Sequence, residues 1–266
     1  MQASPIIDHI VAWLKSYCAE SGSRGFVVAV SGGIDSAVTS KLAAKTYLPT
    51  LCLEMPIHQD RAQVECAVNH INHLRSFHSN VDSLHINLTP VFKRFVKALP
   101  KVEIGLGSSR KVSLANSRAR LRMTTLYYYA AINNYLVVGT GNKVEDFGVG
   151  FFTKYGDGGV DISPIADLTK SEVYRIGDAL GINKEIMQAQ PTDGLYKDNR
   201  TDEDQLGASY EEMEWAMSYN EEGTDHLSSR QLKVLKIYQK LHKANQHKMN
   251  PIPVCTIPDE LRINGI

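Results

Sequence analysis

The stretch Phe26-Val27-Val28-Ala29-Val30-Ser31-Gly32-Gly33-Ile34-Asp35-Ser36 decides how this chain folds. Its first five residues are apolar and mostly β-branched, which predicts a buried strand, and residues 37–45 predict a helix. The two glycines therefore lie on a turn between strand and helix, where they let the backbone approach a ligand closely. Because the free N–H groups at the start of a helix favour anions, the turn suits a phosphate chain.

The side chains of this turn indicate which phosphate ligand it holds. Ser31 and Ser36 offer hydroxyls that favour anionic oxygen, and Asp35 adds a carboxylate beside them. A carboxylate next to phosphates is expected mainly where a Mg²⁺ ion lies between the two. The turn lacks the Lys-Ser or Lys-Thr of a Walker A loop. Ser-Gly-Gly-x-Asp-Ser instead resembles the pyrophosphate loop of the ATP pyrophosphatases, which cleave ATP between its α and β phosphates. The plain alternative is a helix N-cap with two turn glycines.

Composition argues against several other classes of protein. The 266 residues carry 29 basic and 29 acidic side chains, and no Lys-rich run suggests a nucleic-acid partner. No apolar stretch approaches a membrane span and the N-terminus lacks a signal-peptide pattern, so we expect a soluble, cytoplasmic protein without a membrane partner. The four scattered cysteines form no C-x-x-C pair, which argues against a zinc site or a disulfide framework.

Strands and helices alternate along the chain. The expected strands are 26–30, 50–55, 84–88 and 135–139; the expected helices are one at the N-terminus and those at 37–45, 59–77, 91–98 and 114–133, with a surface loop at 101–112. This alternation predicts an α/β fold: a doubly wound, mostly parallel sheet with helices on both faces and ligands at the carboxyl ends of the strands. No linker divides residues 1–266, which we expect to form a single domain. His70, His73 and His78 are expected on a solvated helix face rather than in a metal site.

Four later segments carry further candidate chemistry. After the fourth expected strand, Thr140 is placed to bond a nucleotide, and Glu145 offers a second carboxylate for a metal. Residues 150–161 combine glycines, aromatic residues and aspartates, as expected of an ordered substrate loop. Lys170 falls in the first turn of a helix, where a cation opposes the helix dipole and is sensible if an anionic ligand lies in front of it. A basic cluster at 242–248 is also able to reach a phosphate.

Taken together, these segments resemble the ammonia-dependent NAD⁺ synthetases, in the family's order and over almost the whole chain. The motifs that carry the resemblance are Ser-Gly-Gly-x-Asp-Ser, Ala119-Arg120-x-Arg122-Met123, Gly139-Thr140, Phe152-Thr153-Lys154-Tyr155-Gly156-Asp157, Asp161, Leu168-Thr169-Lys170, Pro191-Thr192, Asp202-Glu203-x-x-Leu206-Gly207 and His247-Lys248. The resemblance implies an adenine nucleotide alpha hydrolase-like fold. It also implies a homodimer with the dinucleotide bound near the subunit interface, for which the N-terminal helix and the 114–133 helix are candidates.

The resemblance also implies roles for individual residues. The ATP-binding residues would be Ala29, Val30, Ser31, Gly32, Gly33, Ile34, Asp35, Ser36, Thr140, Lys170 and Thr192. The deamido-NAD⁺-binding residues would be Arg120, Lys154, Asp161, His247 and Lys248. Asp35 and Glu145 would bind Mg²⁺, with Asp146 as an alternative, because Glu145 and Lys154 are one residue further apart than in the commonest family pattern. Asp35, Lys170 and Asp161 would be the catalytic residues, Asp161 by orienting or deprotonating ammonia.

The implied reaction is the last step of NAD⁺ biosynthesis, an amide formation in two steps. The nicotinate carboxylate of deamido-NAD⁺ attacks the α-phosphorus of ATP, and ammonia then displaces AMP from the adenylate. Free ammonia is the expected nitrogen source, since 266 residues leave no room for a glutaminase domain. The alternatives are another ATP pyrophosphatase, such as a tRNA-modifying adenylating enzyme, and a non-catalytic nucleotide sensor. We expect residues 101–112 and 194–205 to be poorly ordered without ligands.

Overall fold

A four-stranded parallel sheet forms the centre of the computed structural model, which describes residues 1–100, 107–192, 201–220 and 226–262. The strands are β1 (Gly25–Ala29), β2 (Thr50–Glu54), β3 (Val81–His85) and β4 (Tyr135–Val138), in the order β3-β2-β1-β4. Val28 of β1 lies opposite Cys52 of β2 and Val138 of β4.

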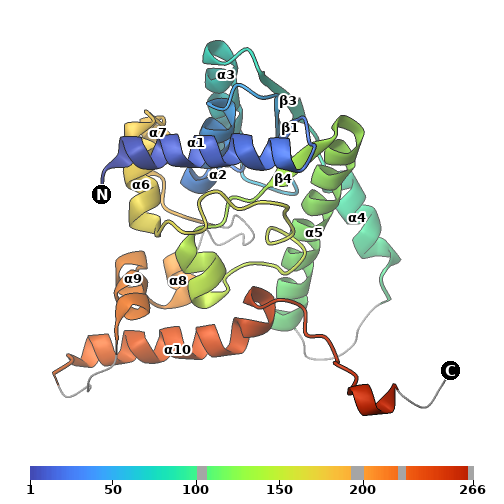
Figure 1. Ribbon diagram of the computed structural model, residues 1–266. Helices are drawn as coiled ribbons and strands as arrows, with labels where there is room; N and C mark the ends of the chain where they lie inside the picture. Colours follow the sequence, from blue (N-terminus) through green and yellow to red (C-terminus); the bar gives the residue numbers. More distant parts are fainter. Residues whose placement is uncertain (101–106, 193–200, 221–225, 263–266) are drawn as a thin grey trace.

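Helices cover both faces of this sheet (Figure 1). The helical elements are α1 (Ala3–Glu20), α2 (Ile34–Ala44), α3 (Arg61–Phe77), α4 (Thr89–Ala98), α5 (Gly107–Asn133), the π-helical turn η1 (Val144–Val149), α6 (Lys170–Ala179), α7 (Lys184–Gln188), α8 (Asp202–Leu206), α9 (Tyr210–Ser218), α10 (Ser229–Met249) and the 3₁₀ turn η2 (Asp259–Leu261). Of these, α10 and η2 lie away from the sheet (Figure 1). No helix in the described ranges has the length and apolar composition needed to cross a bilayer.

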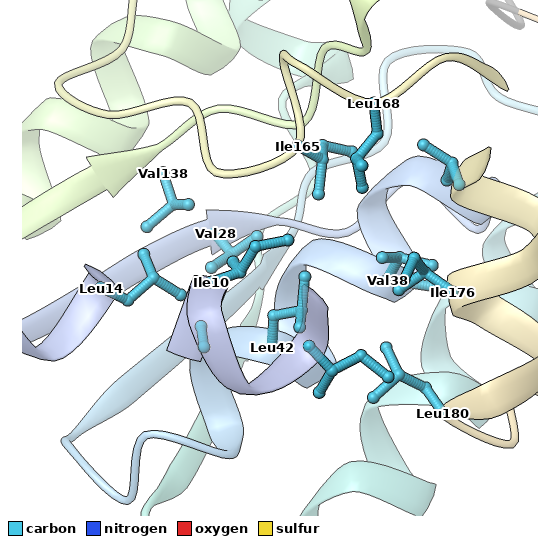
Figure 2. Close-up of a cluster of buried hydrophobic side chains, with 14 of the residues drawn as sticks. Ile10, Leu14, Val28, Val38, Leu42, Val138, Ile165, Leu168, Ile176 and Leu180 are labelled. Carbon is cyan, nitrogen blue, oxygen red and sulfur yellow. The ribbon is translucent and has the colours of Figure 1, made fainter. Parts of the chain in front are cut away.

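Alternate residues of β1 build the cores on the two faces of the sheet. Phe26 and Val28 pack with α1, α2 and α6, whereas Val27 packs with α4 and α5. Figure 2 shows the first of these cores, in which Val28 meets Leu14 of α1 and Val38 of α2. Because successive side chains of a strand point to opposite faces, a strand covered on both sides is apolar throughout. The doubly wound parallel sheet predicted from the sequence is confirmed.

The C-terminal helices form a separate apolar cluster near η1. Val144 and Val149 of η1 pack with Met213 of α9 and Val234 of α10, and all four side chains are at most 1% exposed. This packing fixes the short turn that follows β4, and it brings α9 beside the carboxyl ends of the strands (Figure 1).

The order of the strands places a ligand site between β1 and β4. From β1 the chain continues to β2 and β3 on one side, whereas β4 pairs with the other side of β1. Such a reversal leaves a crevice at the carboxyl ends of the two central strands, where ligands of open α/β sheets bind.

Several expected boundaries were wrong. α2 begins at Ile34 rather than at residue 37. β3 begins at Val81 rather than at residue 84, because Asn80 joins the sheet first: its carbonyl accepts from the Thr50 N–H, and its side chain donates to the Leu48 carbonyl. Residues 107–112 are helical rather than a loop, because α5 already begins at Gly107, and Ser113 donates to the Ser109 carbonyl within it. Residues 101–106 lie outside the described residues.

His70 is buried rather than solvated, which corrects the expectation for that residue. Its side chain lies between α3 and α2, where Nε2 is 2.9 Å from the hydroxyl of Ser40. Burial lowers the pKa of His70 to about 4, so the ring is neutral at pH 7. All four cysteines are free thiols, as expected, although Cys255 is fully exposed.

Candidate active site

The glycine turn after β1 has the shape of an anion site. Gly32 has a φ of 89°, and a Cβ there would lie 2.7 Å from the Gln63 carbonyl oxygen, so only glycine fits. Ser36 donates to the Gly33 carbonyl at 2.9 Å and lies 3.1 Å from the Ser31 hydroxyl. Gly33, the N-cap of α2, provides no side-chain cap, so its first-turn N–H groups remain oriented for an anion.

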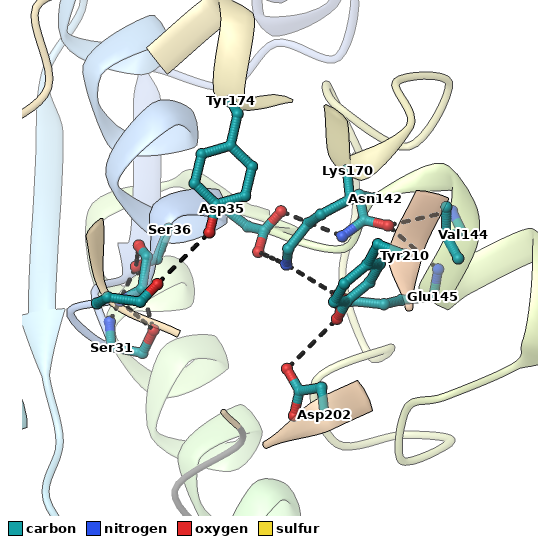
Figure 3. Close-up of polar contacts among 12 residues, drawn as sticks. Ser31, Asp35, Ser36, Asn142, Val144, Glu145, Lys170, Tyr174, Asp202 and Tyr210 are labelled. Carbon is teal, nitrogen blue, oxygen red and sulfur yellow. Dashed lines mark hydrogen bonds and ion pairs between the residues drawn. The ribbon is translucent and has the colours of Figure 1, made fainter. Parts of the chain in front are cut away.

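Lys170 joins the carboxylates of two other elements at the edge of this turn. Its ammonium donates to Asp35 in the first turn of α2 at 2.6 Å and to Glu145 in η1 at 3.0 Å. The three side chains are only 4%, 17% and 17% exposed, respectively. Figure 3 shows Lys170 between the two carboxylates. A capping box of Thr169 and Glu172 sets the start of α6, so that Lys170 is its first residue.

The charges of this cluster stabilise one another. Burial alone would lower the pKa of Lys170, but the carboxylates of Asp35 and Glu145 overcome this and raise it above its ordinary value. Burial acts on Glu145 in the opposite sense, yet Lys170 and the hydroxyl of Tyr210 hold the pKa of that carboxyl below its ordinary value. Burial raises the pKa of Asp35, although Lys170 opposes this shift. The site at neutral pH therefore carries a protonated lysine beside an ionised Glu145.

Asn142, which the sequence did not single out, links the two metal-ligand candidates. Its buried side chain donates to Asp35 at 3.1 Å, and its oxygen accepts from the N–H groups of Val144 and Glu145 at 3.1 and 3.2 Å. One amide therefore both orients Asp35 and caps the turn that carries Glu145. Its place directly after a Gly-Thr-Gly turn is a weak signal of this role.

Tyr210 of α9 closes the cluster from the other side. Its hydroxyl donates to Glu145 Oε1 at 2.6 Å and lies 3.3 Å from Asp202 Oδ2. Burial raises the pKa of Tyr210, and the neighbouring Glu145 and Asp202 raise it further, so the hydroxyl stays a proton donor. No pattern in the sequence indicated this contact, because Tyr210 reads there only as a residue of a capped helix.

Asp146 points elsewhere, although the sequence left it open as a metal ligand. A Cβ at Gly141 would lie 2.1 Å from its carboxylate, so the side chain crosses that glycine instead of facing Lys170. Burial raises the pKa of Asp146 to about 8, with Glu145 and Asp157 contributing. The described residues contain no group of three His, Cys, Asp or Glu placed to hold a metal. Asp35 and Glu145 are the pair that shares a cation, here the ammonium of Lys170.

One face of α5 holds the loop that the sequence predicted to contact substrate. Thr153 donates to Asn116 at 2.9 Å, and Arg120 donates to the Lys154 carbonyl at 3.2 Å. Eleven positions after Asn116 on the same face, Tyr127 donates to Asp161 at 2.9 Å. The other oxygen of Asp161 accepts from the Val137 N–H at 2.8 Å, so this carboxylate ties the end of the loop to β4 and α5.

The end of α10 reaches the same loop. Lys248 donates to the carbonyls of Gly150 and Phe152 at 2.7 and 2.9 Å, and the Lys154 ammonium donates to the His247 carbonyl. Of the five residues assigned to the dinucleotide, the structure thus gathers Arg120, Lys154, His247 and Lys248 around residues 150–154. Asp161 lies apart from them, beside β4.

The remaining ATP candidates lie around the two strand ends. Ala29 ends β1, Val30 is buried directly after it, and Thr140 follows β4 by two residues. Thr192 is the last described residue before position 193. Segment 194–205 divides, because Thr201 caps α8 and 202–205 belong to that helix, while 194–200 lie outside the described residues.

Comparison with known proteins identifies relatives over almost the full chain. The family model described as NAD synthase matches residues 6–252. The NH(3)-dependent NAD(+) synthetase of Alkaliphilus metalliredigens is 39% identical over 266 residues, 95% of this chain and 99% of that protein. Among solved structures, the NMN synthetase of Francisella tularensis matches with a TM-score of 0.83 and 31% identity, over 97% of this chain and 100% of that one. The NH3-dependent NAD synthetase of Campylobacter jejuni matches with a TM-score of 0.77 and 26% identity, over 96% and 100%.

Proposed function

The chain belongs to the NAD synthase family, and from that premise we propose that it is an ammonia-dependent NAD⁺ synthetase. In this reaction deamido-NAD⁺ and ATP form an adenylate and pyrophosphate, and ammonia then yields NAD⁺ and AMP. The observation that carries the proposal is the Asp35–Lys170–Glu145 cluster, which lies against the anion-binding turn at the carboxyl end of β1. A nucleotide sensor would not need a buried cation and two carboxylates at that point.

The cluster suits the first chemical step. Activation is necessary because the oxygen of a carboxylate is a poor leaving group, whereas AMP is a good one. As the α-phosphorus is attacked, negative charge develops on its oxygens. The Lys170 ammonium and the first-turn N–H groups of α2 are placed to stabilise that charge. No covalent nucleophile is required, and burial raises the pKa of the thiols of Cys18 and Cys52 well away from the thiolate form.

The donor set also fits a divalent ion. Asp35 and Glu145 supply the carboxylate oxygens that Mg²⁺ prefers, and they already share one cation between them. Mg²⁺ bound there would neutralise phosphate oxygens as a Lewis acid. Asp161 remains the candidate that orients ammonia, supported by its place at the end of the loop held by α5.

A second acceptor deserves a separate test because the Francisella relative makes NMN. The same amidation on nicotinate mononucleotide, which lacks the adenylate half, would give NMN. The two acceptors share the reacting carboxylate and differ only in how far they extend from it.

The test is an end-point assay of the purified chain with ATP, Mg²⁺ and either acceptor, supplied with ammonium or with glutamine. We expect NAD⁺ and AMP in equal amounts from deamido-NAD⁺ and ammonium, with NAD⁺ followed by alcohol dehydrogenase and AMP by chromatography. Product only from the mononucleotide would favour the second acceptor. No AMP with either acceptor would refute the proposal.

Replacing Asp35 tests the cluster in the same assay. Asp35→Ala should abolish AMP formation and leave the circular dichroism spectrum unchanged, because the side chain lies at the site rather than in an apolar core. Asp167→Ala is the matched control: this aspartate also pairs with a lysine, Lys143, but is 97% exposed. An active Asp35→Ala chain would refute the role of the cluster.

A further inference from the structure

Tyr210 contacts two of the three charged side chains of the cluster, Glu145 and Lys170. Its hydroxyl donates at 2.6 Å to Glu145 Oε1, the same oxygen that accepts from Lys170 at 3.0 Å. Its ring lies under the Lys170 ammonium, 4.7 Å from Nζ to the ring centroid. Figure 3 shows the ring and hydroxyl of Tyr210 beside both groups. The hydroxyl therefore orients the carboxylate, while the ring face attracts the cation.

The position of Tyr210 is itself fixed by its own helix. Tyr210 is the first residue of α9, after the Ser209–Glu212 capping box, and its N–H donates to Glu203 at 2.9 Å. The side chain is only 4% exposed and packs in the apolar cluster with Met213. A ring held in this way cannot turn away from Glu145 without repacking the cluster.

We propose that Tyr210 is a positioning residue: its hydroxyl sets the orientation in which Glu145 receives a divalent ion, and its ring holds the Lys170 ammonium beside the nucleotide phosphates. The inference rests on the proposed function and adds to it. Asp35 and Glu145 would hold the divalent ion, which would then share these carboxylates with the Lys170 ammonium. The ring of Tyr210 keeps that ammonium at the site, so the metal and the lysine act on the phosphates together.

The two contacts are separable by substitution. Tyr210→Phe removes the hydroxyl and keeps the ring, whereas Tyr210→Leu removes both. Tyr238→Phe is the matched control, since this tyrosine lies on α10 in the same apolar cluster and stacks on His242. Binding of α,β-methylene ATP, measured by calorimetry with Mg²⁺ and again with EDTA, separates metal-dependent from metal-independent affinity without any turnover.

We expect Tyr210→Phe to bind the analogue about tenfold more weakly with Mg²⁺ and unchanged with EDTA, because one hydrogen bond to a carboxylate is lost. In turnover, it should need about tenfold more Mg²⁺ for half-maximal rate and keep kcat within about twofold. Tyr210→Leu should lose affinity under both conditions, because Lys170 is no longer held. Tyr238→Phe should behave as the unmodified chain.

Two results would overturn the inference. One is Tyr210→Phe with unchanged affinity in Mg²⁺. The other is an equal loss with Mg²⁺ and EDTA, which would show a merely structural role. If the unmodified chain forms product and either of these results appears, only the proposed role of Tyr210 is refuted. If the unmodified chain neither binds the analogue nor forms product, the proposed function is refuted as well.

Discussion

Lys170 offsets part of the negative charge of the candidate site, and its neighbours hold its ammonium in place. The sequence indicates Asp35, Glu145 and Lys170 as candidate site residues, because each follows a strand or opens a helix at the edge where the strands of a parallel sheet end. It does not indicate Asn142 or Tyr210. Their roles depend on contacts that join residues 107 and 65 positions apart, which no local pattern encodes.

Asn142→Asp tests this arrangement at the level of one atom. The substituted side chain keeps an acceptor for the N–H groups of Val144 and Glu145. It replaces the amide that donates to Asp35 with a third carboxylate beside Asp35 and Glu145. We expect kcat/KM to fall about a hundredfold and the free energy of unfolding to fall by about 1–3 kcal/mol, the cost of an unmatched buried polar group. Steady-state kinetics and urea unfolding measure the two effects.

Asn245→Asp serves as the control for this substitution. The side-chain amide of Asn245 donates a hydrogen bond as well, but its acceptor is the carbonyl of Val149, and it lies on α10, away from Asp35. Equal losses in the two variants would contradict a specific role of Asn142 in orienting Asp35.

Helices and strands lie where the apolar periodicity of the sequence predicts them, except that contacts between helices bury some polar residues that periodicity assigns to solvent. The helix at 61–77 was predicted within two residues of its start, but His70 was assigned to its solvated face. Periodicity treats histidine as polar, and it cannot reveal that Ser40 of α2 lies opposite. Arg122, which belongs to one of the motifs that carry the family resemblance, is likewise used internally: it donates to Met55 and Gln59 and holds the turn after β2.

His70 makes the packing of α2 on α3 sensitive to acid. The unfolded chain binds a proton near pH 6.5, whereas the folded chain resists protonation until pH about 4. The depressed pKa therefore destabilises the folded state as pH falls through this window, by about 3 kcal/mol when it has been crossed. His70→Gln should remove that share of the acid sensitivity, measured as urea unfolding between pH 7 and pH 4.

His9→Gln, at an exposed position of α1, is the control for the histidine variant. It should unfold with the same pH dependence as the unmodified chain. If His70→Gln also follows that curve, the ring of His70 does not resist protonation in the folded protein.

At the scale of the whole molecule, the sequence predicted the sheet and both covering layers, because strands and helices alternate with short turns. It did not place α9 and α10, whose attachment to η1 depends on apolar residues that look like any other helical core. The surface left by this packing is informative. Tyr128 and Ile132 of α5 are 61% and 60% exposed, and Trp13 and Tyr17 of α1 are 38% and 39% exposed.

We propose that these exposed residues of α1 and α5 form a homodimer interface. The segment that follows α1 is bonded to the end of α5, since Arg24 donates to the Asn133 carbonyl. Light scattering of the protein as it elutes from a size-exclusion column should give twice the chain mass of 29.5 kDa. Ile132→Glu should give the single-chain mass, because a charge at an apolar contact is costly to desolvate. Val254 lies in the C-terminal segment and is 82% exposed. Val254→Glu should therefore leave the measured mass at twice the chain mass. A monomeric unmodified chain would contradict the interface.

The ammonium between Asp35 and Glu145 also bears on how the chain reaches its native state. Zinc fingers and similar metallo-domains unfold under chelation, because their ion supplies the free energy of folding. Here a counter-charge is covalently part of the polypeptide, and both carboxylates are paired with it as soon as α6 docks on α2. Newly synthesised molecules can thus mature in surroundings depleted of divalent ions, and then wait, folded and intact, for metal and nucleotide to arrive together.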